Sequence, residues 1–142
     1  MDLNIKSGVK EYILNGANGA YTLRFNPTDG GFAEDIINAL DTLDKIEEKY
    51  SDLIKNEQNG NKVFSLGREK DTEERAILDS VLGDGACETL FGRIRVYSGD
   101  GEGFPLWLSL LTMLIDEMSA AFEMEKKETN PRLEKYLQKY KK

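Results

Sequence analysis

Few residues of this 142-residue chain could do nucleophilic or metal chemistry, because histidine is absent and cysteine occurs once, at Cys87. Without histidine, no Ser-His or Cys-His nucleophile can form, and the commonest metal ligand and general base is missing. A single cysteine excludes an intramolecular disulfide and a Cys-type zinc site within one chain. A position near the start of a short helix would favour the thiolate, but we expect Cys87 to be a small buried residue.

Acidic side chains are abundant, and adjacent pairs occur at Glu34-Asp35, Glu47-Glu48 and Glu73-Glu74. A catalytic pair needs burial that separates two pKa values, whereas these pairs lie largely on the solvent faces of predicted helices. The Gly-rich segment 98–103 lacks the Gly-Lys-Ser/Thr of a phosphate loop and the later ligands of a calcium loop. We interpret it as a mobile connector. The sequence therefore predicts no enzymatic activity, no metal and no cofactor.

The overall charge and hydropathy exclude further classes of protein. The net charge is -7, with a pI of about 4.7, opposite to a protein whose task is to coat nucleic acid. The most apolar stretch, 104–115, is shorter than the roughly 20 residues that a membrane-spanning helix needs. The N-terminus has no apolar stretch typical of a signal peptide. We expect a cytoplasmic protein that binds neither nucleic acid nor membrane.

The first predicted element of the chain is a region in which apolar and polar residues alternate, as in a β-strand. Two β-rich runs, 9–14 and 20–25, flank an Asn/Gly cluster that suits a tight turn, which predicts a hairpin with Tyr21, Leu23 and Phe25 on one face. Leu3 and Ile5 are candidates for an additional short strand.

After Gly31 the apolar spacing becomes helical. We expect helices over 32–53 and 104–125, a helix starting at a capping box of Asp71 and Glu74, and a short one capped by Asp84. A last helix is expected from Pro131. Gly83, Gly85 and Gly92 are interpreted as structural turns, with Gly83 in the left-handed conformation.

These elements predict an α+β fold, mainly α, with an N-terminal antiparallel β-hairpin and a bundle of four to five helices. The chain is interpreted as a single domain, 1–142, with a hairpin region 1–28, a helical core 29–128 and a C-terminal helix or tail 129–142. Ile94 and Val96 are expected to turn inward. The predicted core anchors are Phe32, Ile36, Leu40, Leu43, Ile77, Val81, Leu90, Phe91, Leu110, Leu111 and Leu114.

The segment 81–92, Val-Leu-Gly-Asp-Gly-Ala-Cys-Glu-Thr-Leu-Phe-Gly, resembles an FGEGTAEKLFG-like signature. That signature belongs to small, mostly uncharacterised proteins from phages and prophages of Gram-positive bacteria. In that family it follows an acidic and apolar helix and precedes a loop, an apolar helix and a basic C-terminal end, a layout found here over roughly residues 25–142. The matching residues are Gly83, Gly85, Glu88, Leu90, Phe91 and Gly92.

The resemblance implies a phage tail-module product, a tail assembly chaperone or a related assembly factor in the bacterial host cytoplasm. Such factors keep the aggregation-prone tape measure protein soluble while tail tube subunits polymerise around it. The implied partners are tape measure or other tail proteins, and a homo-oligomer is left open. The alternative is a structural virion component, such as a head–tail connector or tail-completion subunit. The resemblance supplies no catalytic residues.

The 104–115 region has more apolar residues than one buried stripe can use, which favours a surface that binds another helix. The segment from Pro131 has its own apolar stripe and a basic end, which suits either a solvated helix terminus or docking on an acidic surface. The candidate partner-binding residues are Leu106, Trp107, Met113, Tyr136 and Tyr140.

Overall fold

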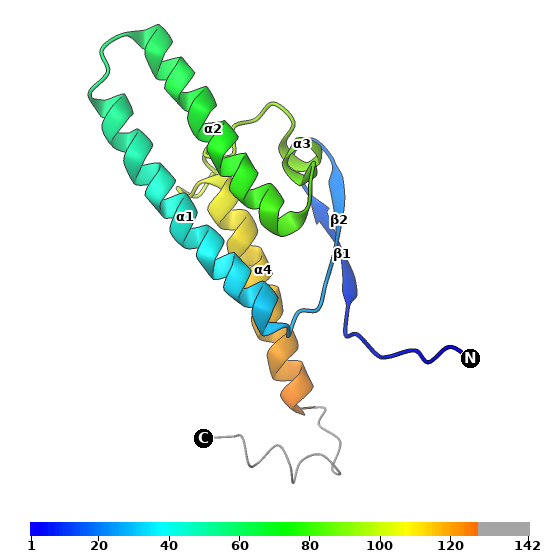
Figure 1. Cartoon of the computed structure of the whole chain (residues 1–142). Coiled ribbons are helices and arrows are strands. Elements are labelled where there is room, and N and C mark those ends of the chain that lie inside the picture. The colour runs from blue at the N-terminus through cyan, green and yellow to red at the C-terminus, as the bar shows by residue number, and fades with distance from the viewer. Residues whose placement is uncertain (128–142) are drawn as a thin grey trace.

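The computed structural model describes residues 1–127, and over that range a two-stranded hairpin is followed by four helices (Figure 1). This confirms the predicted architecture, a mainly α fold that opens on an antiparallel hairpin. The predicted helix from Pro131 and the tail 129–142 lie outside the described residues.

The hairpin consists of β1 (Lys10–Asn15) and β2 (Ala20–Phe25), which pair in antiparallel register. The backbone N–H of Gly16 donates to the carbonyl of Gly19 over 2.9 Å and closes the turn. Leu23 and Phe25 are buried and Tyr21 is half-buried, so the predicted inward face is confirmed. The additional strand at Leu3 and Ile5 is wrong: both residues are exposed and no segment pairs with them.

The tip of the hairpin packs directly on the short helix α3 (Ala86–Phe91). The backbone N–H of Asn18 donates to the carbonyl of Leu90 over 2.9 Å. A Cβ added at Gly16 would lie 2.3 Å from that same carbonyl oxygen, so a side chain cannot fit without moving backbone.

Gly16→Ala should therefore destabilise the fold by roughly 1–3 kcal/mol, the usual cost of overpacking. Gly60→Ala is the matched control, because a Cβ at Gly60 meets nothing within 4 Å. Chemical denaturation of both variants checks this. Equal stability of the two variants would mean that the hairpin tip does not pack against α3.

Helix α1 (Gly30–Lys55) begins where Asp29 accepts a hydrogen bond from the backbone N–H of Gly31. Its predicted core anchors Phe32, Ile36, Leu40 and Leu43 lie in the core or pack against it, whereas Leu53, near the end of the helix, is exposed. The buried residues of α1 are Ile36, Ala39, Leu43, Ile46 and Tyr50.

Helix α2 (Gly60–Leu82) begins well before the predicted capping box. The Asn59 side chain caps it by accepting from the N–H groups of Asn61 and Lys62. The capping box is therefore wrong: Asp71 and Glu74 lie inside the helix and are buried. Backbone N–H groups in a helix interior already have intrahelical partners, so no cap is needed there.

The three signature glycines lie at helix ends: Gly83 follows α2, and Gly85 and Gly92 flank α3. Gly83, Gly85 and Gly92 have positive φ angles of 119°, 83° and 54°. Gly83 ends α2 with ψ 153°, which is not the left-handed helical conformation that was expected. The cap assigned to Asp84 is also wrong: Gly85 occupies the N-cap of α3, and the Asp79 carboxylate accepts from the Cys87 N–H over 2.9 Å.

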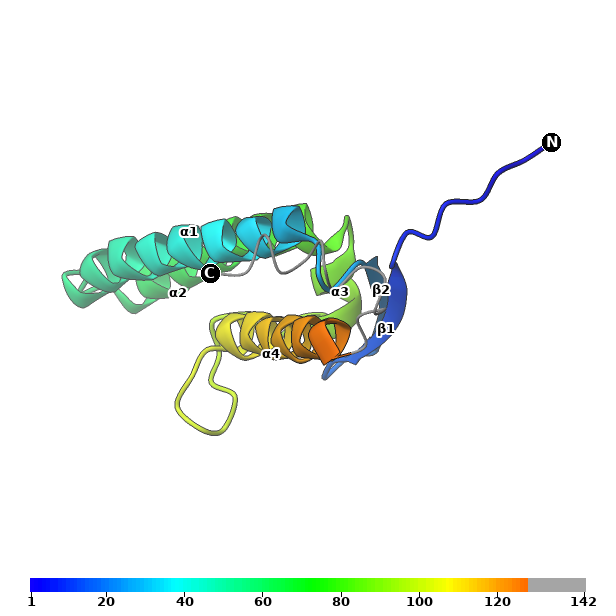
Figure 2. The same cartoon turned by 90° about the horizontal axis from the view of Figure 1, so that it is seen from below.

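Helix α4 (Leu106–Lys127) packs against α1. The core lies between α4 on one side and the α1–α2 pair on the other. Seen from below, α4 forms a separate layer, and the hairpin with α3 closes one end of the space between the layers (Figure 2). None of the helices in residues 1–127 combines the length and apolar character needed to cross a membrane.

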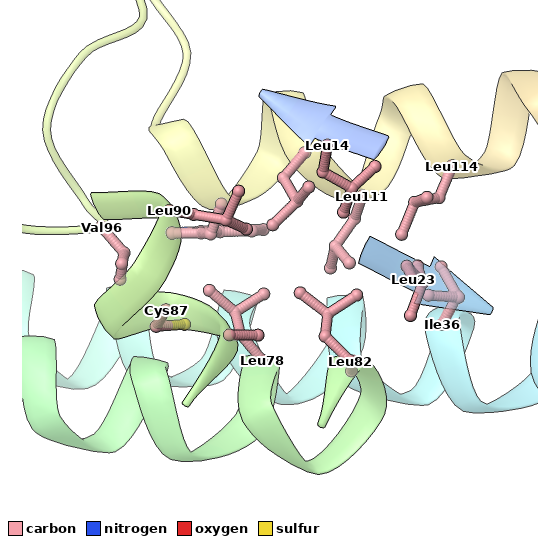
Figure 3. Packing of buried hydrophobic residues seen from close by; sticks show 14 of the residues in the cluster. Leu14, Leu23, Ile36, Leu78, Leu82, Cys87, Leu90, Val96, Leu111 and Leu114 are labelled. Carbon is pink, nitrogen blue, oxygen red and sulfur yellow. The ribbon is translucent and has the colours of Figure 1, made fainter. Parts of the chain in front are cut away.

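The core fills the space between these layers. Leu78 and Leu82 of α2 point toward Leu111 and Leu114 of α4, with Leu14 of the hairpin between the layers (Figure 3). Every predicted core anchor belongs to this cluster or packs against it, with Phe32, Leu40, Ile77 and Val81 partly buried. Val96 is buried as expected, but Ile94 is exposed, which corrects its inward assignment.

Candidate functional site

An apolar hollow of about 230 Å³ opens where α4 passes the hairpin turn and α3. Leu106 and Met113, two of the predicted partner-binding residues, both line it. Leu106 is partly buried against the core, whereas Met113 is 48% exposed. The remaining walls come from the turn 14–17 and from Leu90 and Phe91. The structure thus brings residues of three elements together around an open apolar depression.

A second hollow of about 570 Å³ adjoins the first along the outer side of α4. The two share Ser109 and Met113, so they form one continuous surface, which we call the α4 surface. Its added apolar residues are Phe104 and Leu108. The same hollow is lined by four carboxylates, Asp100, Glu102, Asp116 and Glu117. The α4 surface is therefore apolar at one end and acidic at the other.

Asp100 organises the loop that borders this surface. Its carboxylate accepts from the N–H groups of Glu102 (2.7 Å) and Phe104 (3.2 Å) and from the Ser109 hydroxyl. These hydrogen bonds, the one from Ser109 first, lower the pKa of Asp100. The base of the loop is closed by the Leu106 N–H, which donates to Ser98 O over 2.8 Å. The 98–103 segment is thus held by hydrogen bonds at both ends, and its interpretation as a mobile connector stays a prediction.

Trp107 does not lie on the α4 surface. It is 4% exposed, and its Nε1 donates to Glu47 Oε1 over 3.0 Å, so it belongs to the core. This corrects its assignment as a partner contact: the indole needs a buried acceptor, and Glu47 of α1 supplies one. Tyr136 and Tyr140 lie outside the described residues.

Sequence reasoning missed a buried polar cluster beside Trp107. Glu47 of α1 forms an ion pair with Lys70 of α2 over 2.7 Å, and the Lys70 Nζ lies 4.3 Å from the centre of the Tyr97 ring. Glu74, one turn along from Lys70, is 0% exposed. The acid pairs 47–48 and 73–74 were assigned to solvent, and for Glu47 and Glu74 that is wrong.

Glu74 is buried as a neutral acid. Burial first, then the hydrogen bond to Glu47 and its negative charge, raises the pKa of Glu74 to about 9. Neither Glu74 oxygen has a donor within reach, so the group is not stabilised as a carboxylate; protonated, it donates to Glu47 instead. Burial alone would raise the pKa of Glu47, but hydrogen bonds from Glu74, Lys70 and Trp107 bring it below its ordinary value.

This cluster joins α1, α2 and α4 through an ion pair and hydrogen bonds, and it lies apart from the hollows described above. No wall of the hollows described above includes Glu47 or Glu74, so a substrate has no route to them there. Within residues 1–127 no group of three or more His, Cys, Asp or Glu side chains is arranged to hold a metal ion. Cys87 is buried, as expected, and burial raises the pKa of its thiol. The absence of enzymatic activity stays a prediction.

A second network holds the loop after α3. Asp71 accepts from the Val96 N–H over 2.8 Å and pairs with Arg75 over 2.9 Å. Arg75 also donates to the carbonyls of Gly92 and Ile94, over 2.6 and 2.7 Å. The segment that leads from the signature to α4 is thereby tied to α2.

No protein-family model matches the chain, and neither a curated protein nor a solved structure matches it. Functional inference therefore depends on the residues of the chain and on their geometry.

Proposed function

We propose that this chain is a non-enzymatic phage or prophage tail assembly factor, a tail assembly chaperone of the host cytoplasm that binds a tape measure protein. The observation that supports this best is the α4 surface, because it joins an apolar hollow to an acidic one. A tape measure protein is long and helical, and grooves of this kind receive amphipathic helices through apolar anchors one or two turns apart.

The position of Met113 makes it the central contact of the proposed interface. It is shared by both hollows and is half exposed, so a bound helix would cover it from either side. A flexible thioether also adapts to different partner side chains, which suits a factor that binds a repetitive segment. The carboxylates at the acidic end favour a client helix with Lys or Arg on its polar face.

Met113→Glu should weaken binding of the tape measure protein at least tenfold, because it places a charge in the middle of the apolar contact. Loss of a central interface residue costs about 2 kcal/mol or more. Met124→Glu is the matched control: it lies on the same helix, is 57% exposed and lines neither hollow. Binding is measured by titration calorimetry against soluble tape measure fragments, with melting curves showing that both variants fold.

Equal effects of Met113→Glu and Met124→Glu would contradict the proposed surface. Failure of the unmodified chain to bind any tape measure fragment, or to raise its solubility on co-expression, would contradict the proposed function. Mass spectrometry of purified particles separates this function from a head–tail connector or tail-completion subunit, which would be present at fixed copy number.

A further inference from the structure

A second apolar groove lies on the other side of α4, away from the α4 surface. It holds about 320 Å³ between the start of α1 and the second half of α4. Pro27, Ala33 and Ile37 form one wall, and Ile115 and Met118 belong to the other. Ile37 is 50% exposed although it is apolar and faces this groove. The groove shares no residue with the two hollows of the α4 surface.

The helical stretches that form the groove carry one sign of charge. Residues 29–44 and 106–125 contain nine Asp or Glu residues and no Lys or Arg. Residues 128–142 contain five basic residues and two acidic ones, a net charge of +3, so the net charge of -7 leaves -10 on residues 1–127. The most basic segment of the chain thus follows directly after α4, one of the two acidic helical stretches that form this apolar groove.

The apolar pattern of the C-terminal segment also matches the groove in length. Leu133, Tyr136, Leu137 and Tyr140 are spaced as one helical stripe over eight residues, a rise of about 10 Å from the first to the last. The wall from Ile115 to Phe122 also covers eight residues of α4, again a rise of about 10 Å. Residues 128–130 before Pro131 are as many as a short connection between antiparallel helices requires.

We propose that residues 131–142 of this chain dock as a helix into the groove between α1 and α4, antiparallel to α4. The stripe of leucines and tyrosines covers Ile37, Ile115 and Met118, and the lysines face the acidic rims. This assigns Tyr136 and Tyr140 to an intrachain contact instead of the client interface. It leaves the α4 surface open, so it does not depend on the proposed function.

Disulfide trapping in the full chain tests the docking. The double variant Ile37→Cys with Leu137→Cys should form an intrachain disulfide under mild oxidation. Asn38→Cys with Leu137→Cys is the matched control, because Asn38 is exposed, adjacent in sequence and about 100° away around the helix. A docked tail should link to position 37 at least tenfold faster than to position 38, since an undocked tail would reach both about equally.

Peptide mapping identifies the linked cysteines, so the buried Cys87 need not be replaced. Similar rates at positions 37 and 38 would overturn the docking, as would no linkage at either. Disulfide-linked dimers in place of intrachain products would also overturn it, because they would show a second copy in the groove.

Discussion

Replacing Trp107 by alanine should destabilise the fold by about 3–5 kcal/mol, the range for removing a large buried aromatic side chain. The indole is 4% exposed and its Nε1 is a hydrogen-bond donor to Glu47. Its removal therefore leaves a cavity between α1 and α4 and takes one hydrogen-bond donor away from the half-buried Glu47 carboxylate. Because typical domains are stable by only about 5–15 kcal/mol, this loss is a large fraction of the total stability.

Two further variants make this prediction specific. Trp107→Phe keeps most of the ring but not the N–H, and should cost about 1–2 kcal/mol. Phe104→Ala removes an aromatic side chain that is 54% exposed and should change stability by less than about 1 kcal/mol. Urea unfolding is followed by circular dichroism for all three variants, because two of them lack the only tryptophan and cannot be followed by its fluorescence. A stable Trp107→Ala variant with impaired tape measure binding would contradict the core assignment and show that Trp107 belongs to the partner surface.

The sequence predicts the hairpin and the helix α1 well because each has one clear period. Tyr21, Leu23 and Phe25 alternate, and the stripe from Phe32 to Tyr50 keeps helical spacing. Both patterns place apolar residues on a single face, and the structure buries those faces. Local patterns are reliable where the buried positions are apolar.

Helix α2 is where prediction from sequence fails, for a physical reason. Its buried residues include Gly67, Lys70, Asp71 and Glu74. Half of the buried positions on its inward face are therefore charged residue types. A polar run between two apolar segments reads as a helix start, whereas here it is a helix interior. The partners that make burial tolerable come from distant segments: Glu47 for Lys70 and Glu74, and the Val96 N–H for Asp71. No local pattern reports such long-range pairing.

Long-range packing also explains why only part of the partner-binding prediction agrees with the structure. Leu106 and Met113 meet at one hollow, but Trp107, between them in sequence, turns about 100° around the helix toward Glu47. Which apolar residues of α4 remain outside depends on where α1, α3 and the hairpin pack. The surplus of apolar residues was visible in the sequence, but its distribution was not.

Glu74→Gln should stabilise the fold at neutral pH by roughly 3 kcal/mol and flatten its pH dependence. In the folded chain the pKa of Glu74 is raised to about 9, whereas an unfolded glutamate ionises near 4.3. Between these values the unfolded chain binds fewer protons, so stability is fully present below about pH 4, falls as pH rises and levels off above about pH 9. Glutamine has the shape of the neutral acid and an N–H₂ donor for Glu47, and it does not ionise.

The control for this prediction is Glu48→Gln, which makes the same substitution at an exposed neighbour of Glu47. Unfolding free energies of the three proteins between pH 5 and pH 9 are the measurement. The wild-type chain and Glu48→Gln should lose stability across this range, while Glu74→Gln should lose much less. If Glu74→Gln instead lowers stability and keeps the wild-type pH profile, Glu74 is ionised in the fold and a cation must neutralise it. If Glu74→Gln flattens the pH dependence as expected, the contact between α1 and α2 depends on the proton that Glu74 retains in the folded chain.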